Sequence, residues 1–130
     1  MKKWRLLSIP SNRLTAIEGL EELESLEEIY VSHNGIERLA GVDFNFRLTT
    51  LDVAGNRIAA IENVQHLSAL EEFWCNHNQI ANWSDVDGLA HLEALNCVYL
   101  EHNPIANDPM YRKKVKLAIP QIKQIDATLA

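Results

Sequence analysis

The sequence predicts an α/β solenoid, with a curved parallel β-sheet on its concave face and 3₁₀ or short helical turns on its convex face. Two observations lead to this fold class: an apolar pattern that recurs about every 22 residues, and an asparagine at the same place in each recurrence. The chain has 130 residues, of which 47% are apolar and 23% charged, as in an ordinary folded domain. Stacked repeats of this kind bury one continuous core.

The period of the repeat is set by five asparagines. They stand 22, 22, 22 and 25 residues apart, at Asn12, Asn34, Asn56, Asn78 and Asn103. Apolar residues precede each by eight, five and three positions and follow it by two, which gives the consensus L-x-x-L-x-L-x-x-N-x-I of a short leucine-rich repeat. An asparagine side chain offers donors and an acceptor to the backbone of a turn. We therefore expect a structural asparagine ladder that takes no part in chemistry.

Each L-x-L segment alternates as a short strand with one buried face does, and one strand per coil gives a parallel sheet. The rest of each coil, as in residues 17–23, has apolar residues three apart, which favours 3₁₀ or irregular turns over long helices. We divide residues 1–107 into five repeats, at about 4–25, 26–47, 48–69, 70–94 and 95–107.

The repeat at 70–94 is longer than the others, and two helices are predicted near the end of the chain. Three extra residues precede Asn103, and there Ser84 and Asp87 resemble a capping box that opens a true helix. The pair Asp108-Pro109 predicts the N-cap and first turn of a second helix, which runs through about Ala118.

Residues 108–130 are assigned as a C-terminal cap, because the apolar end of a repeat array needs a cover. Within them Ile122, Ile125 and Ala127 repeat the strand spacing without an asparagine. No comparable cap precedes Trp4, which already occupies the first apolar position of the first coil. We expect the chain to be part of a longer array, or this end to be covered by a partner or by self-association.

The net charge of -6 is divided unevenly along the chain. Residues 1–13 hold four Lys or Arg and no acid, residues 14–111 hold three Arg against 17 Asp or Glu, and residues 112–130 hold five Lys or Arg against one Asp. Nucleic-acid affinity comes largely from Lys and Arg on phosphates, so this acidic body predicts no nucleic-acid partner. The basic stretch 112–116 is either a solvated helix face or a contact for an acidic surface. The sequence contains no run of 18 apolar residues, so we predict no membrane partner.

The sequence predicts no enzyme and no cofactor, since it lacks the common nucleotide-binding, nucleophile and zinc-protease motifs. His33, His77 and His102 each precede a ladder asparagine, and the last two should lie roughly 5 Å apart on neighbouring coils. They are either a two-histidine metal site or solvated turn residues, and without a third ligand we predict no metal. Cys75 should be buried and Cys97 should face outward, which argues against a disulfide.

The outward side of the predicted strands is the candidate binding surface. Its notable residues are Glu28, Tyr30, Asp52, Glu72, Trp74, Tyr99 and Glu101. Folding gives no reason for an outward Trp on a strand, whereas Trp and Tyr often anchor interfaces. We expect Glu72, Trp74, Tyr99 and Glu101 to form one contiguous patch, suited to a partner with a basic surface. The alternative is aromatic stacking that only stiffens the sheet.

Two segments resemble a known family. Residues 72–78 (EFWCNHN) and the cap, from 103–105 (NPI) through 111–115 (YRKKV) to 125–128 (IDAT), resemble the leucine-rich-repeat regulatory subunits of protein phosphatase 1. The resemblance spans essentially the whole chain and corresponds to the C-terminal repeats and cap of that family.

The resemblance implies a noncatalytic subunit of nucleus and cytoplasm whose concave face binds the phosphatase catalytic subunit. The positions that match the family's contact residues are Asp52, Glu72, Trp74 and Tyr99. The earlier repeats of the family have no counterpart here, and Pro10 is unlike a polar contact residue. The alternative is a structural adaptor in another complex, such as a dynein or spliceosomal assembly, because those proteins share the 22-residue repeat.

Overall fold

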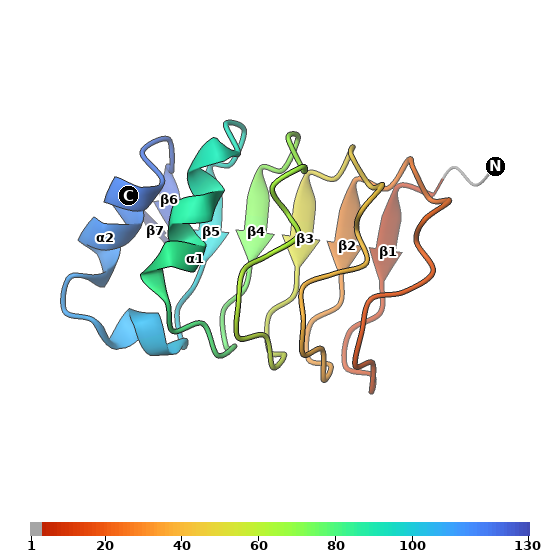
Figure 1. The fold of residues 1–130 in the computed structure, drawn as a ribbon, viewed down its shortest axis with the longest axis horizontal. Coiled ribbons are helices and arrows are strands. Elements are labelled where there is room, and N and C mark those ends of the chain that lie inside the picture. The colour runs from red at the N-terminus through yellow and green to blue at the C-terminus, as the bar shows by residue number, and fades with distance from the viewer. Residues whose placement is uncertain (1–3) are drawn as a thin grey trace.

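A computed structural model describes residues 4–130 as a solenoid whose strands lie side by side in one seven-stranded sheet (Figure 1). The strands are β1 (Leu6–Ser8), β2 (Glu28–Tyr30), β3 (Thr50–Asp52), β4 (Glu72–Trp74), β5 (Cys97–Tyr99), β6 (Gln124–Ile125) and β7 (Thr128–Leu129). Their order in the sheet follows the sequence; β1 to β6 are parallel, and β7 returns antiparallel to β6. The predicted fold class is confirmed. The three residues before Trp4 lie outside the described residues.

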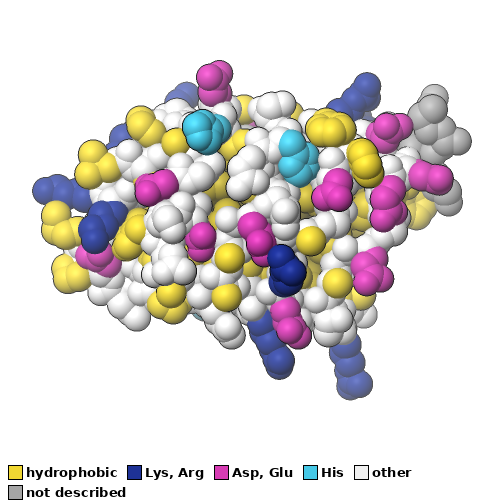
Figure 2. Space-filling model, in the orientation of Figure 1, with side chains coloured by type: hydrophobic (Ala, Val, Ile, Leu, Met, Phe, Trp, Pro, Cys, Tyr) yellow, Lys and Arg dark blue, Asp and Glu magenta, His cyan; other side chains and the backbone are white. Residues whose placement is uncertain are grey.

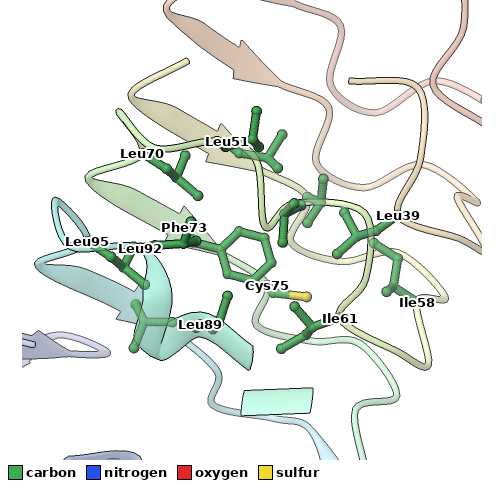
Figure 3. Close-up of a cluster of buried hydrophobic side chains, with 14 of the residues drawn as sticks. Leu39, Leu51, Ile58, Ile61, Leu70, Phe73, Cys75, Leu89, Leu92 and Leu95 are labelled. Atoms are coloured by element: carbon green, nitrogen blue, oxygen red, sulfur yellow. The ribbon is translucent and has the colours of Figure 1, made fainter. Parts of the chain in front are cut away.

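The strands pair without any shift in register, so equivalent residues of successive coils form straight rows. The inward row consists of Leu7, Ile29, Leu51, Phe73, Val98 and Ile125. Phe73 is fully buried, and its ring lies among leucine and isoleucine side chains from neighbouring coils (Figure 3). Full burial of such a side chain is worth roughly 1.5–3 kcal/mol, so this row and its neighbours hold the coils together.

The asparagines connect successive coils through their side chains, as Asn56 illustrates. Its Nδ2 donates to the carbonyl of Val53 in its own coil and to that of Val31 in the preceding coil, at 2.9 and 3.2 Å. Its Oδ1 accepts from the backbone N–H groups of Asn34 and Ile36, both at 3.1 Å. Asn34, Asn78 and Asn103 repeat most of this pattern.

The residue before each asparagine turns the chain with a positive φ. Ser11, His33, His77 and His102 have φ between 54° and 59°, and Gly55 has φ 68°. The glycine is needed for a second reason, because a Cβ at Gly55 would lie 2.5 Å from His33 Nδ1. The His33 ring therefore occupies the space that a side chain would take on the next coil.

Over residues 4–130, the convex side carries helix only near the C-terminal end (Figure 1). Helix α1 spans Trp83–Asp87 and continues as a 3₁₀ turn over Gly88–His91. The helix is present, but the predicted capping box is wrong: the N-cap is Asn82, and Ser84 lies inside the first turn. Asparagine is itself a favoured N-cap residue, and here it stands where the chain is still extended.

The second helix, α2, spans Tyr111–Ala118 and ends where predicted. Its start is later than predicted, because Pro104–Asn107 forms a 3₁₀ turn and the Asp108 side chain accepts a bond from the Met110 N–H in a separate turn. A third correction concerns Ala127, which is exposed in the two-residue turn between β6 and β7.

At the other end of the sheet, Trp4 and Leu6 are each 52% exposed. A hollow at this end is lined by residues of the first coil, including Leu7, Ile9 and Leu14. Within residues 4–130, no helix has both the length and the apolar character needed to cross a membrane.

Candidate protein-binding face

The register of the sheet places the predicted site residues in rows on the concave face. One row contains Leu6, Glu28, Thr50, Glu72, Cys97 and Gln124, and the next contains Ser8, Tyr30, Asp52, Trp74 and Tyr99. Glu101 lies beyond the end of β5. Its backbone carbonyl accepts a hydrogen bond from the His77 N–H, and one coil earlier the Asn76 carbonyl accepts the same bond from the Gly55 N–H. Glu72, Trp74, Tyr99 and Glu101 are thus brought together on adjacent coils.

Trp74 stands at the centre of a row of three aromatic rings. The centroid of its ring lies 6.1 Å from that of Tyr30, with planes at 65°, and 5.6 Å from that of Tyr99, with planes at 57°. Strands β2 and β4 are two steps apart in the sheet, a separation of about 9.6 Å at the usual strand spacing. The rings of Tyr30 and Trp74 therefore lean toward each other across the intervening strand β3.

Asp52 lies on that intervening strand, in register between the two rings, and its exposure differs from expectation. It is only 7% exposed, and its Oδ1 accepts a 3.0 Å bond from the Ala54 N–H. Burial raises the pKa of this carboxyl, against the lowering effects of the Ala54 N–H and of His33. The geometry makes Asp52 a support beneath the rings and leaves it little surface for a partner.

Tyr30 is fixed by the carboxylate at the other end of its own strand. Its hydroxyl donates to Glu28 Oε1, and this bond, followed by burial, raises the pKa of Tyr30 to about 12. The charges of Glu72 and Asp52 act in the same direction. The phenol is therefore protonated at neutral pH, and its donor is committed to Glu28.

Tyr99 is held from the cap, which sequence reasoning did not anticipate. Gln124, on β6, donates from Nε2 to Tyr99 Oη at 3.2 Å and to the Asp126 carbonyl at 2.8 Å. Burial is the largest cause of a raised pKa at Tyr99. The signal that could have revealed Gln124 is its place in the repeat, because it occupies the strand position of Glu72 and Cys97.

Both cysteines are free, and Cys97 is a further departure from expectation. It has the predicted outward register, yet it is only 5% exposed, because neighbouring side chains cover it. Burial raises the pKa of Cys97 to about 11, and it also raises the pKa of the fully buried Cys75. Neither thiol is ionised at neutral pH.

The indole N–H of Trp74 is the least satisfied donor on this face. The ring is half-buried, yet Nε1 is buried and has no hydrogen-bond partner among the described residues. Leaving such a donor unpaired costs roughly 1–3 kcal/mol. Because Nε1 is itself buried, an acceptor on a partner protein could reach it only if the indole ring moved.

The histidines of the turn row do not assemble into a metal centre in the described part of the chain. The rings of His77 and His102 stack with centroids 4.1 Å apart and planes at 12°. His33 is separated from them by Gly55, which stands at the equivalent turn position. Within residues 4–130, no group of three or more His, Cys, Asp or Glu residues is placed to hold a metal ion.

A solenoid whose sheet displays an aromatic row bordered by carboxylates is a scaffold of the kind that binds other macromolecules across its strands. Because a family model described as Leucine-rich repeat matches residues 1–128, the chain belongs to the leucine-rich repeat family.

Relatives with curated names match part of the chain. The Homo sapiens protein named Protein phosphatase 1 regulatory subunit 7 is 55% identical over 49 residues, which is 38% of this chain and 14% of that protein. Protein phosphatase 1 regulatory subunit SDS22 of Schizosaccharomyces pombe is 47% identical over 45 residues, or 33% of this chain and 14% of that one. The predicted resemblance to protein phosphatase 1 regulatory subunits is confirmed by these relatives, but over 33–38% of this chain and not over nearly all of it. The matches span about 14% of the length of the relatives.

Among solved structures, a chain in the crystal structure of the Drosophila melanogaster SNF/U2A' complex superposes with a TM-score of 0.87. The sequences are 25% identical, and the match covers 95% of this chain and 73% of that one.

Proposed function

We propose that this chain is a noncatalytic regulatory subunit, or a part of one, that binds the protein phosphatase 1 catalytic subunit through its concave face. The names of its relatives support the choice of partner. The observation that carries the choice of surface is the half-buried Trp74, held between Tyr30 and Tyr99 with its N–H unpaired. As part of the same proposal, the protein acts in the nucleus and cytoplasm.

The direct contacts in this proposal are Glu28, Tyr30, Glu72, Trp74, Tyr99 and Glu101. Each is partly exposed, so a partner can reach it. Asp52 supports the aromatic rings from below instead of touching the partner. The carboxylates favour a partner with a basic surface, which they attract and orient, while the aromatic rings supply the contact area.

Calorimetric titration with the phosphatase catalytic subunit tests the proposal. Trp74→Ala should weaken binding by about 2 kcal/mol or more, roughly 30-fold, because a central aromatic anchor is lost. Glu72→Lys should also weaken it, because it reverses a charge on the face. Glu37→Lys is the matched control, since Glu37 is exposed away from the strands. Binding that both concave-face variants leave unchanged would move the interface elsewhere.

A second candidate function is a structural adaptor in another complex, such as a dynein or spliceosomal assembly. The observation that favours it is the superposition on a chain of the SNF/U2A' complex, which covers 95% of this chain. The same titration separates the two functions, because an adaptor would not bind the catalytic subunit even with its concave face intact.

A further inference from the structure

One asparagine of the ladder has a neighbour that differs chemically from those of the others. Asn34 is followed by Gly35, and no other asparagine of the sequence is followed by glycine. The other ladder asparagines precede arginine, glutamine or proline. A backbone nitrogen can attack the side-chain amide carbon of the asparagine before it, and glycine hinders this attack least because it has no Cβ. Asn34 is therefore the residue of this chain best suited to spontaneous deamidation.

The reaction needs only water besides these two residues. The Gly35 nitrogen loses its proton and forms a bond to Asn34 Cγ, while the bond from Cγ to Nδ2 breaks, so that ammonia leaves and a cyclic succinimide remains. Water then adds to one of the two succinimide carbonyls and opens the ring. The product is aspartate, or isoaspartate if the main chain now runs through the side-chain carbon. One water is consumed, one ammonia is released, and nothing is oxidised or reduced.

In the folded chain both reacting groups are held by hydrogen bonds, mostly to the first coil. The Gly35 N–H donates to the Leu14 carbonyl at 2.7 Å. The Asn34 Oδ1 accepts from the N–H groups of Asn12 and Leu14, at 3.0 and 3.2 Å. Its Nδ2 donates to the Ile9 carbonyl at 3.0 Å and to two carbonyls of its own coil. Attack by the Gly35 nitrogen therefore requires the first coil to move away.

The first coil buries its apolar residues less completely than the second coil does. Leu7, Ile9 and Leu14 are only half-buried, whereas their equivalents in the second coil are at most 2% exposed. The hollow at this end of the sheet is lined by the same three residues. Because burial of apolar area holds a coil against its neighbour, the first coil opens at a lower cost in free energy than the coils behind it.

Charged groups add little to the packing of the first coil. An ion pair joins Arg5 Nε to Glu27 Oε2 at 2.9 Å, but the Arg5 side chain is 74% exposed, and exposed pairs contribute little to stability. Figure 2 shows charged side chains spread over this end of the molecule, at the right of the view. Those side chains contact water whether the coil is packed or open. Local opening of the first coil is therefore the route by which Asn34 and Gly35 become free to react.

We propose that Asn34 undergoes spontaneous deamidation, that the folded first coil slows this reaction, and that the product keeps the first coil from packing back. In the product a carboxylate replaces the amide. No donor then remains for the carbonyls of Ile9, Val31 and Ser32, and a negative charge faces their oxygens. Isoaspartate also adds one carbon to the backbone between the two coils. The inference concerns the first two coils and does not depend on phosphatase binding.

Mass spectrometry of proteolytic fragments, after incubation of the whole chain in mildly alkaline buffer, measures the deamidation of each asparagine. In the urea-unfolded chain Asn34 should react about 10-fold faster than Asn56 or more, because Gly35 hinders the attack least. In native buffer the Asn34 rate should fall by about 10-fold or more, since the open state is a minor population. Equal rates for the two asparagines in urea, or equal Asn34 rates in urea and native buffer, would overturn the proposal.

Gly35→Ala is the matched variant for the chemistry. A Cβ at Gly35 would lie 3.4 Å from the Leu14 carbonyl oxygen, an ordinary van der Waals distance, and the φ of Gly35 is not positive. The variant should therefore fold, which circular dichroism checks. In urea its Asn34 should react as slowly as Asn56, and an undiminished rate would show that the reaction does not run through the Gly35 nitrogen.

Two further variants separate opening of the first coil from unfolding of the whole chain. Leu7→Ala removes apolar contact between the first two coils and should speed the reaction of Asn34 in native buffer several-fold. Ile122→Ala is the control, because Ile122 is only 1% exposed but lies in the cap at the other end of the sheet. It should leave the Asn34 rate unchanged. Equal acceleration by both variants would assign the reaction to global unfolding and overturn the role of the first coil.

Hydrogen exchange followed by NMR tests the effect of the product. The Ile9 and Ser11 N–H groups donate to carbonyls of the second coil, at 2.8 and 2.9 Å. In deamidated protein, purified by ion exchange, and in Asn34→Asp, these two amides should exchange about 10-fold faster or more, because the first coil stays open. The Val53 N–H, bonded between the third and fourth coils, should exchange as in wild type. Unchanged protection at Ile9 and Ser11 would overturn the proposed effect of the product.

Discussion

Tyr111 Oη donates a 2.8 Å hydrogen bond to Asp126 Oδ2, and both residues are buried where α2 meets the end of the sheet. The other carboxylate oxygen accepts from the backbone N–H groups of Leu100 and Glu101, at 2.8 and 3.0 Å. Asp126 turns the chain with φ 56° just after β6. A single carboxylate thus joins the helix of the cap to the last full coil.

Replacing this carboxylate should destabilise the cap strongly. Asp126→Ala leaves three donors without an acceptor, so we expect a loss of about 3 kcal/mol or more in the free energy of unfolding, measured with urea. Tyr111→Phe removes one bond only and should cost about 1 kcal/mol. Equal losses from the two variants would contradict this division of roles.

Gly55→Ala should cost less stability when His33 is also replaced. A Cβ at Gly55 would lie 2.5 Å from His33 Nδ1, and φ is 68°. Gly55→Ala should cost roughly 1–3 kcal/mol, because it adds this clash to the strain of a positive φ. In the double variant with His33→Ala the clash is absent, so thermal unfolding should show a smaller loss than the sum of the single variants. Simple additivity would count against the contact.

The backbone and its rows could be predicted from the sequence, because the 22-residue spacing fixes which residues share a register. The exposure of individual side chains could not. Asp52 and Cys97 have the outward register that alternation predicts, but the larger side chains beside them cover both. The role of Asp126 also escaped prediction, because a turn with positive φ directs its carboxylate inward.

Asn45→Leu should stabilise the protein. The carbonyls of Leu20 and Leu23 that Asn45 contacts also accept backbone bonds from Leu23 and Leu26, so they keep a partner when the amide is removed. The leucine would fill the position as in neighbouring coils and would abolish a buried oxygen, Asn45 Oδ1, that has no partner among the described residues. We expect a gain of about 1–2 kcal/mol in the free energy of unfolding. A lower melting temperature would show that the two hydrogen bonds from Asn45 Nδ2 stabilise the protein more than the unpaired Oδ1 destabilises it.

Asp52→Asn should stabilise the protein at neutral pH and change phosphatase binding little. Burial raises the pKa of Asp52 in the folded state, so the folded protein binds a proton more readily than the unfolded chain does. Stability therefore falls as pH rises from about 4 through this raised pKa, and the ionised carboxylate carries a penalty at pH 7. The gain from Asn should be present at pH 7 and absent below about pH 4. Urea unfolding at both pH values measures this gain, and a lower free energy of unfolding for Asp52→Asn at pH 7 would contradict the prediction.

Trp74→Phe should separate the contribution of the ring from that of its N–H. The phenyl ring keeps much of the contact with Tyr30 and Tyr99 but has no donor to leave unpaired. The smaller ring buries less apolar area, which destabilises the fold, but the cost of a buried, unpaired N–H disappears. Because these two effects oppose each other, we expect the free energy of unfolding to change by less than about 1 kcal/mol. Binding to the phosphatase catalytic subunit should fall less than in Trp74→Ala, since the phenyl ring keeps part of the contact area of the indole. Titration and urea unfolding of this variant and of Trp74→Ala provide the comparison. Binding by Trp74→Phe as weak as that by Trp74→Ala would show that a phenyl ring cannot replace the indole as an anchor.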